Sequence, residues 1–333
     1  DQAVPRQCLH PHARPAVRGL LPFAPAGFAA TGQTVFMTQT GRVVASHGRH
    51  VVVEDSAGNR RICHPRGKKN QAVVGDWVQW LASEDEGSIE SVDTRKNLFY
   101  RQDDIRTKSF AANLDQVLVL VAAEPEFSQS QVARALIAAE HAGIRSLIAL
   151  NKQDLREAFD KAWARLSPYR AFGVNVLPLG LRQLEDPLLA LRAEMHHRVT
   201  LVLGPSGAGK STLINRLVPA ANATTNIISK ALNSGKHTTT STTWYWVDAD
   251  KNTALLDSPG FQEFGLNHIA ATDLATCMPD IRPFKDDCKF YNCTHVHEPE
   301  CGVRRALKAG EIDAGRYKIY GDLFAELSAP KNY

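Results

Sequence analysis

The segment GPSGAGKST at 204–212 constrains the fold of this chain more than any other part of the sequence. It follows the apolar run VTLVL and leads into KSTLINRLV, whose apolar residues have helical spacing. This order predicts a buried strand, a glycine-rich loop and a helix, with backbone N–H groups of the loop pointing at a phosphate. The segment therefore predicts a nucleoside triphosphate site within a parallel sheet, but it does not name the base.

The residues of this phosphate loop have different expected tasks. Lys210 is expected to reach the β- and γ-phosphates, Ser211 to ligate Mg²⁺ and Thr212 to contact the α-phosphate. Glycines near both ends of the loop allow its backbone to curl. The other predicted nucleotide-binding residues of the loop are Gly204, Pro205, Ser206, Gly207, Ala208 and Gly209.

A second motif, LLDSPG, ends another buried apolar run. Asp257 lies at the expected strand end, where its carboxylate can hold Mg²⁺ through water, and Gly260 can donate its N–H to a γ-phosphate. An aspartate at a strand end is common by itself. Its position after a phosphate loop favours the interpretation as a γ-phosphate sensor.

A third motif, NKQD at 151–154, follows the apolar run SLIAL. Asp154 is expected to accept hydrogen bonds from N1–H and the exocyclic N2–H of guanine, a donor pair that adenine does not present. Asn151 is expected to contact N7 and brace the phosphate loop, Lys152 to lie along the base, and Gln153 to complete the binding motif. A helix cap would explain Asp154 equally well in isolation, but a position beside the phosphate-loop strand favours GTP.

The polar segment GKHTTTSTTWYW lies between the phosphate loop and LLDSPG. One of its threonines could close over Mg²⁺ and the γ-phosphate, and Thr239 is the preferred candidate, with Thr238 and Thr240 close behind. An exposed β-edge or a polar linker is the alternative interpretation. The expected Mg²⁺ ligands are therefore Ser211, Thr239 and Asp257.

Three of the six cysteines fall in the short segment CKFYNCTHVHEPEC. Cys288, Cys293, His295 and Cys301 form a Cys₃His set that suits one tetrahedral Zn²⁺ with no open position, and hence a structural role. His297 is the competing ligand, and buried thiols without a metal are the remaining alternative. This pattern favours a metal site over disulfides and suits the reducing environment of the cytosol.

Short runs of alternating polarity fill the chain from Thr38 to about Asp104 and predict a small β-barrel, with an OB-like barrel as the preferred form. The net charge of +4 permits an RNA partner only if basic residues cluster. Basic loops of the barrel could meet RNA phosphates or could be a solvated rim. These basic residues are Arg42, Arg49, His50, Arg60, Arg61, Arg66, Lys68 and Lys69.

From Ala112 to LLDSPG, continuous apolar runs alternate with segments of helical spacing, which predicts a parallel sheet with helices on both faces. Most GTPases have the phosphate loop first and NKxD late, whereas this chain has NKxD, phosphate loop, switch threonines and DxPG. The four loops can still converge, because the sheet sets their positions and a chain can be cut at an exposed loop.

With these motifs in this order, the sequence resembles the circularly permuted, ribosome small-subunit-dependent GTPases called RsgA or YjeQ. The segments RHVVVE, CHPRGKK and NLFYRQDDIRTKSFAANLDQVL and the spacing C-x₄-C-x-H-x₅-C also resemble that family. The resemblance covers nearly everything from Thr38 onward. One departure is VLPLG at 176–180, where Ser-Ala or Ser-Val is more usual, so we assign no base contact there.

The resemblance implies a multi-domain chain. We expect an OB-like RNA-binding barrel at 38–106, a circularly permuted α/β P-loop GTPase domain at 107–268 and a mainly helical zinc-binding domain at 269–333. Residues 1–37 are expected to be a disordered leader or a non-native extension, with Met37 as a start, because two prolines interrupt the apolar stretch that a secretory signal would need.

The resemblance also implies a function. We expect a cytoplasmic, monomeric GTPase without membrane contact, which converts GTP to GDP and phosphate on the small (30S) ribosomal subunit and its 16S rRNA. Hydrolysis would be coupled to late maturation of that subunit and to release of the GTPase. The alternatives are an ATP-dependent P-loop enzyme and an RNA-binding assembly factor that uses GTP only as a ligand.

Catalysis in such a protein needs a group that orients the attacking water. Many GTPases place Gln directly after DxxG, but the corresponding residue here is Phe261, which cannot form that hydrogen bond. The hypothesis is that hydrolysis is slow until the small subunit orders the switch loops, with His237 or a ribosomal group beside the water. Gln262 is a less favoured substitute. The expected catalytic set is Lys210, Thr239, Asp257, Gly260 and His237.

Overall fold

The structure is a computed structural model that describes residues 38–47, 50–67, 71–83, 86–103, 106–183, 188–221, 242–258, 261 and 264–330. These residues belong to one compact unit, Met37–Tyr333. Several predictions therefore lie outside the described residues. They concern the leader at 1–37, Arg49, Lys68, Lys69, His237, Thr238, Thr239, Thr240, Gly260 and Gln262.

The N-terminal strands form the predicted barrel. Its strands pair in the order β1-β2-β3-β5-β4, and β1 also pairs with β4, so the sheet closes on itself. The β3–β5 pair is parallel and the other pairs are antiparallel. Buried and more exposed residues alternate along β4 and at the start of β5, and Val53, Val78 and Ile89 are fully buried. The strands are β1 (Gln39–His47), β2 (His50–Glu54), β3 (Arg60–Pro65), β4 (Trp77–Ala82) and β5 (Gly87–Val92).

A two-stranded hairpin follows the barrel and was not predicted as a separate unit. It consists of β6 (Leu98–Gln102) and β7 (Thr107–Ala112), so the predicted domain boundary at 106/107 lies between its strands. Phe99 and Phe110 of the hairpin pack against Phe264, with ring centroids 5.7 Å from that of Phe264 in both cases. The hairpin is thereby attached to the segment that follows LLDSPG.

The central region is the predicted α/β sheet, with strand order β10-β9-β8-β11-β13-β12. All neighbouring strands in this order are parallel except β12 and β13, which are antiparallel. Its elements are β8 (Gln116–Ala122), α1 (Gln129–His141), β9 (Arg145–Asn151), α2 (Arg156–Arg165), α3 (Ser167–Ala171), β10 (Asn175–Pro178), α4 (Leu189–Met195), β11 (Val199–Leu203), α5 (Lys210–Leu217), β12 (Thr243–Trp246) and β13 (Ala254–Asp257).

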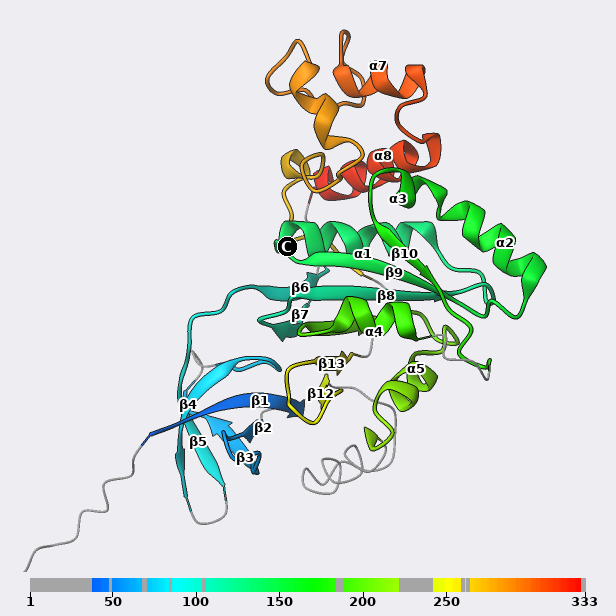
Figure 1. The fold of residues 1–333 in the computed structure, drawn as a ribbon. Coiled ribbons are helices and arrows are strands. Elements are labelled where there is room, and N and C mark those ends of the chain that lie inside the picture. Colours follow the sequence, from blue (N-terminus) through cyan, green and yellow to red (C-terminus); the bar gives the residue numbers. More distant parts are fainter. Residues whose placement is uncertain are drawn as a thin grey trace, which may run out of the picture. The chain divides into compact units, whose positions relative to one another are not determined.

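Helices cover both faces of this sheet (Figure 1). Every residue of β8 is buried, and its side chains divide between two apolar clusters. Val117 and Val119 pack in the cluster that contains α1, α2 and α3, whereas Leu118 and Leu120 pack in the cluster with α4 and α5. The continuous apolar run thus reflects burial on two faces. Ser128 caps the N-terminus of α1, because its hydroxyl oxygen accepts a hydrogen bond from the N–H of Gln131.

The barrel and the α/β region share one 11-stranded sheet, because β1 pairs with β12. The Arg42 guanidinium carbon lies 4.2 Å from the ring centroid of Trp77 and 4.5 Å from that of Trp244, the second residue of β12. Burial lowers the pKa of Arg42 to about 10. This cation between two indoles joins the barrel to β12 of the α/β region.

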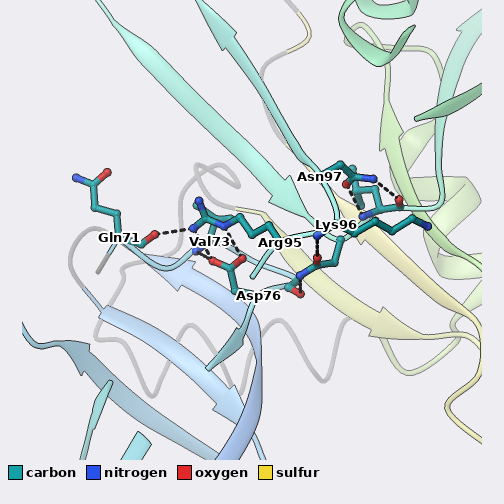
Figure 2. A network of polar contacts seen from close by, with 9 residues as sticks. Gln71, Val73, Asp76, Arg95, Lys96 and Asn97 are labelled. Carbon is teal, nitrogen blue, oxygen red and sulfur yellow. Dashed lines mark hydrogen bonds and ion pairs between the residues drawn. The ribbon is translucent and has the colours of Figure 1, made fainter. Parts of the chain in front are cut away.

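A buried polar network forms a second connection, between the barrel and the start of β8 (Figure 2). Asp76 is fully buried and receives two hydrogen bonds from Arg95, at 2.7 and 2.8 Å. Nearby, Asn97 donates to the carbonyl of Leu114 and accepts from its N–H. Loss of Arg95 would leave the buried Asp76 carboxylate without its charged partner, which is destabilising, so this network fixes the chain as it leaves the barrel.

The C-terminal region is mainly helical, as predicted, and it packs against α1 and α3. Arg316 of α8 bonds to Asp280 at 2.8 Å and lies over the ring of Tyr169 in α3. Arg134 of α1 donates to Glu326 of α8 at 2.8 Å. The elements are η1 (Ala271–Asp273), η2 (Arg282–Asp287), α7 (Gly302–Ala309) and α8 (Ala314–Ser328). None of the helices in the described part of the chain is both long and apolar enough to span a membrane.

Candidate nucleotide site and metal centre

The phosphate loop connects β11 to α5, the strand–loop–helix context that its sequence predicted. Gly207 and Gly209 have φ of 80° and 101°, in the left-handed region that favours glycine. Gly204 is required for another reason, since a Cβ there would lie 2.4 Å from the carbonyl oxygen of Leu120 in β8. Close packing against the neighbouring strand and left-handed turns thus shape the loop.

Lys210 and Asp257 meet at the carboxyl ends of the adjacent strands β11 and β13. The Lys210 Nζ atom donates to Asp257 Oδ1 at 2.7 Å and to the carbonyl oxygen of Ser258 at 2.6 Å. Both side chains are largely buried, at 19% and 14% exposure, so the ion pair is only partly screened by water. The first residue of α5 is therefore linked directly to the segment expected to sense the γ-phosphate.

Asn151 connects the NKQD motif to the phosphate loop. Its Nδ2 donates to the carbonyl oxygen of Ala208 at 2.9 Å, and its Oδ1 accepts from the N–H of Leu181 at 3.2 Å. A Cβ at Gly209 would lie 2.3 Å from this Nδ2, so only glycine leaves room for the contact. The two motifs are far apart in the sequence, and this one buried amide holds them side by side.

A cavity of about 550 Å³ opens beside the NKQD motif. Its volume is within the ordinary range for small-molecule sites. Asp154 is exposed and lines it, whereas Lys152 is half-buried with φ of 69°. The lining residues are Gln153, Asp154, Arg156, Phe159, Asp160 and Gln183.

The loop after β10 contributes to this site, although no base contact was assigned to 176–180 from the sequence. The N–H of Gln153 donates to the carbonyl oxygen of Leu179 at 3.1 Å. Arg216 of α5 donates to the carbonyl oxygens of Leu181 and Gln183 at 2.9 and 3.2 Å. The strand order could have indicated this contribution. Strand β10 lies beside β9 and parallel to it, so the loops after both strands meet at one edge of the sheet.

The Cys₃His set forms a compact metal-binding cluster. The ligand atoms of Cys288, Cys293, His295 and Cys301 all lie within 4.8 Å of one another. His295 Nδ1 is 3.3 Å from the Cys288 sulfur and 3.5 Å from the Cys301 sulfur, and these two sulfurs are 3.8 Å apart. Tetrahedral bonds of about 2.0–2.3 Å give ligand separations of roughly 3.5–3.8 Å, so the cluster fits a single ion. His297, the competing ligand, is exposed and outside the cluster.

Helix α8 holds the histidine-bearing part of this loop. The hydroxyl of Tyr317 donates to the carbonyl oxygen of His295 at 2.7 Å, and that of Tyr320 donates to the carbonyl oxygen of Thr294 at 2.8 Å. Glu298 accepts hydrogen bonds from the N–H and hydroxyl of Thr294. These contacts fix the backbone that carries His295, and so they support the ligand from outside the cluster.

Comparison with known proteins agrees with the architecture and the motif order. The model of the family described as RsgA GTPase matches residues 92–267. A protein from Variovorax paradoxus named small ribosomal subunit biogenesis GTPase RsgA is 64% identical over 302 residues, covering 89% of this chain and 95% of its own length. The chain belongs to the RsgA GTPase family. A relative of the same name from Bordetella pertussis is 47% identical and covers 88% of this chain and 98% of its own length.

Solved structures of RsgA-like proteins have the same fold. The structure of YjeQ from Thermotoga maritima matches with a TM-score of 0.68 and 29% identity, over 88% of this chain and 100% of that chain. The structure of YloQ, described as a circularly permuted GTPase, matches with a TM-score of 0.66 and 26% identity, over 91% of this chain and 100% of that chain. The predicted permuted order is thereby confirmed.

Proposed function

We propose that this chain binds GTP between the NKQD motif and the phosphate loop, hydrolyses it, and acts in biogenesis of the small ribosomal subunit. The observation that carries the proposal is the hydrogen bond from Asn151 to the carbonyl oxygen of Ala208, which joins the NKQD motif, expected to read guanine, to the phosphate loop. The names of the relatives from Variovorax and Bordetella support the ribosomal role. Late maturation of the subunit and release of the GTPase would follow hydrolysis.

The site residues are proposed to act as their positions suggest. Asp154 would read guanine in the cavity beside it, and the phosphate loop with Lys210 would hold the phosphates. Ser211 and Asp257, together with Thr239, would bind Mg²⁺, which neutralises developing charge during phosphoryl transfer. On binding GTP, Lys210 would give up its hydrogen bonds to Asp257 and Ser258 and donate hydrogen bonds to phosphate oxygens instead.

Base specificity should depend on Asp154. In Asp154→Ala we expect GTP affinity to fall about 100-fold or more while ATP affinity stays as weak as before, because the guanine donor pair loses its acceptor. Equilibrium binding of GTP and ATP to both proteins measures this. Asp250→Ala is the matched control, since Asp250 is exposed and does not line the cavity. An unchanged preference in Asp154→Ala would instead favour an ATP-dependent enzyme or another base site.

Hydrolysis should be slow in the isolated protein and faster with small subunits. Phe261 is 3% exposed and packs in the main apolar cluster, so it cannot orient water. We expect multiple-turnover GTP hydrolysis to rise at least tenfold when purified small subunits are added, with His237→Ala losing most of that rise. Equal rates with and without subunits would favour a factor that uses GTP only as a ligand. If His237→Ala kept the full stimulation, another group would have to position the water.

Contact with 16S rRNA is proposed to involve the barrel. Arg66 is 69% exposed and pairs with Glu90, and Arg60 pairs with the buried Glu54, both at 2.8 Å. These arginines would have to exchange carboxylates for RNA phosphates on binding, which makes the interaction dependent on salt. We further propose that the protein acts as a monomer in the cytoplasm, without membrane contact.

The metal of the Cys₃His cluster is proposed to be one structural Zn²⁺. Three thiolates and one imidazole are the donors that zinc prefers, and the four protein ligands leave no position for substrate. The ion would crosslink Cys288 to Cys301, the residue directly before α7. Its role would then be to hold the C-terminal region in a shape that contacts RNA.

A further inference from the structure

The loop after β10, at 179–183, is bound to the NKQD motif at two points. The N–H of Leu181 donates to Asn151 Oδ1 at 3.2 Å. The carbonyl oxygen of Leu179 accepts from the N–H of Gln153 at 3.1 Å. The loop therefore has a fixed position beside the residues that are expected to read the base.

Gln183 brings a side-chain amide from this loop to the cavity beside Asp154, and both residues line that cavity. The backbone of Gln183 is held on two sides. Its N–H donates to the carbonyl oxygen of Gly180 at 2.9 Å, and its carbonyl oxygen accepts from Arg216 at 3.2 Å. The amide itself lies against Gly180, since a Cβ there would be 2.4 Å from Gln183 Cδ and 2.9 Å from its Nε2. Glycine at this position leaves the space that the amide occupies.

The chemistry of guanine leaves one acceptor for this loop. Asp154 is expected to accept from N1–H and N2–H, and Asn151 to contact N7. The remaining acceptor, O6, lies between N1 and N7 along the edge of the base. A guanine held in this way would turn O6 toward the loop after β10, because that loop contacts both Asn151 and the residue before Asp154. Of the residues in this loop, Gln183 is the one that lines the cavity.

We propose that Gln183 is a base-contacting residue, whose Nε2 donates a hydrogen bond to O6 of guanine. This inference rests on the proposed function, because it assumes that GTP binds with its base in that cavity. A side-chain amide carries both donors and an acceptor, so rejection of adenine would remain the task of Asp154. Gln183 would add affinity for purines that carry an oxygen at position 6, such as guanine and hypoxanthine.

The test compares equilibrium binding of three diphosphates, so that GTP hydrolysis does not disturb it. IDP keeps O6 but lacks the 2-amino group of GDP, and 6-thio-GDP carries sulfur, a weak acceptor, in place of O6. In Gln183→Ala we expect affinities for GDP and IDP to fall alike, by about fivefold, because each loses one neutral hydrogen bond. Affinity for 6-thio-GDP should change less than twofold. Arg182→Ala is the control, since Arg182 is an exposed residue of the same loop and does not line the cavity.

A second variant, Gln183→Glu, keeps the size of the side chain but replaces the donor with a carboxylate that only accepts. It should lower the affinities for GDP and IDP at least as much as Gln183→Ala does. Equal losses for GDP and IDP, with 6-thio-GDP little changed, would support the inference. A loss confined to GDP, an equal loss for all three nucleotides, or full GDP affinity in Gln183→Glu would overturn it.

Failure of this inference can be distinguished from failure of the proposed function. If the unsubstituted protein bound neither GDP nor GTP, the proposed function would fail and this inference with it. Binding of GDP that depends on Asp154 but not on Gln183 would reject this inference alone.

Discussion

Replacing Cys288 with serine is expected to remove the bound metal and to lower the free energy of unfolding of the C-terminal region by about 3 kcal/mol or more. Residues 288–301 contain only turns and bends, so the proposed zinc ion is the main crosslink within them. The Cys288 sulfur also accepts a hydrogen bond from the N–H of Gly302, at the start of α7. Zinc content by mass spectrometry and thermal unfolding of the full chain measure both effects.

The matched control for this prediction is Cys277→Ala. Cys277 is buried at 5% exposure in the same region but lies outside the cluster, so this variant should keep one zinc per chain. A strong chelator should reproduce the effect of Cys288→Ser on the unsubstituted protein. Full zinc content in Cys288→Ser, or the same loss of zinc in Cys277→Ala, would contradict the assignment of the ligands.

The consequences of zinc loss should remain mostly local. Helix α8 is attached to α1 by Arg134 and Glu326, and to α3 by Arg316 over Tyr169, and these contacts involve no ligand of the cluster. We therefore attribute the expected instability to the loop that carries the ligands. The proposed nucleotide site lies at the strand ends of the α/β sheet, and one face of this sheet packs in an apolar cluster that contains no residue of the C-terminal region.

Local chemistry explains why the sequence predicted so much of this molecule. The sequence of the phosphate loop predicts its conformation because glycines stand where the backbone turns into the left-handed region or packs against β8. The apolar run VLVLVA within β8 indicated a strand buried on both faces. The cysteine spacing likewise confined Cys288, Cys293 and Cys301 to one cluster. In each case the residues that supported the prediction lie within one short segment.

Contacts between distant segments could not be predicted from the sequence. Hairpin β6–β7 depends on Phe264, which is far along the chain from Phe99 and Phe110, and no local pattern indicates that pairing. The pairing of β1 with β12 and the stacking of Arg42 against Trp244 have the same origin. These interactions follow from how the barrel and the sheet meet, so periodicity and spacing within one segment cannot show them.

The largest effect on activity is expected for Lys210→Ala. We expect GTP hydrolysis to fall about 100-fold or more, because this ammonium is the phosphate-loop cation closest to the proposed γ-phosphate sensor. Binding should weaken as well. Hydrolysis assays with small subunits present measure the first effect, and equilibrium binding of GTP and GDP measures the second. Lys308→Ala in α7 is the control, since Lys308 is exposed and outside the site.

Thermal unfolding distinguishes loss of binding from loss of structure in this variant. Removing Lys210 leaves the Asp257 carboxylate and the Ser258 carbonyl without their bonds at 2.7 and 2.6 Å, so some stability is lost even without nucleotide. A ligand present at about 100 times its dissociation constant stabilises the folded state by about 2.7 kcal/mol. GTP should therefore raise the unfolding temperature of the unsubstituted protein but not that of Lys210→Ala. Equal stabilisation of both proteins, with hydrolysis unchanged, would mean that GTP binds elsewhere and that the Lys210–Asp257 pair is purely structural.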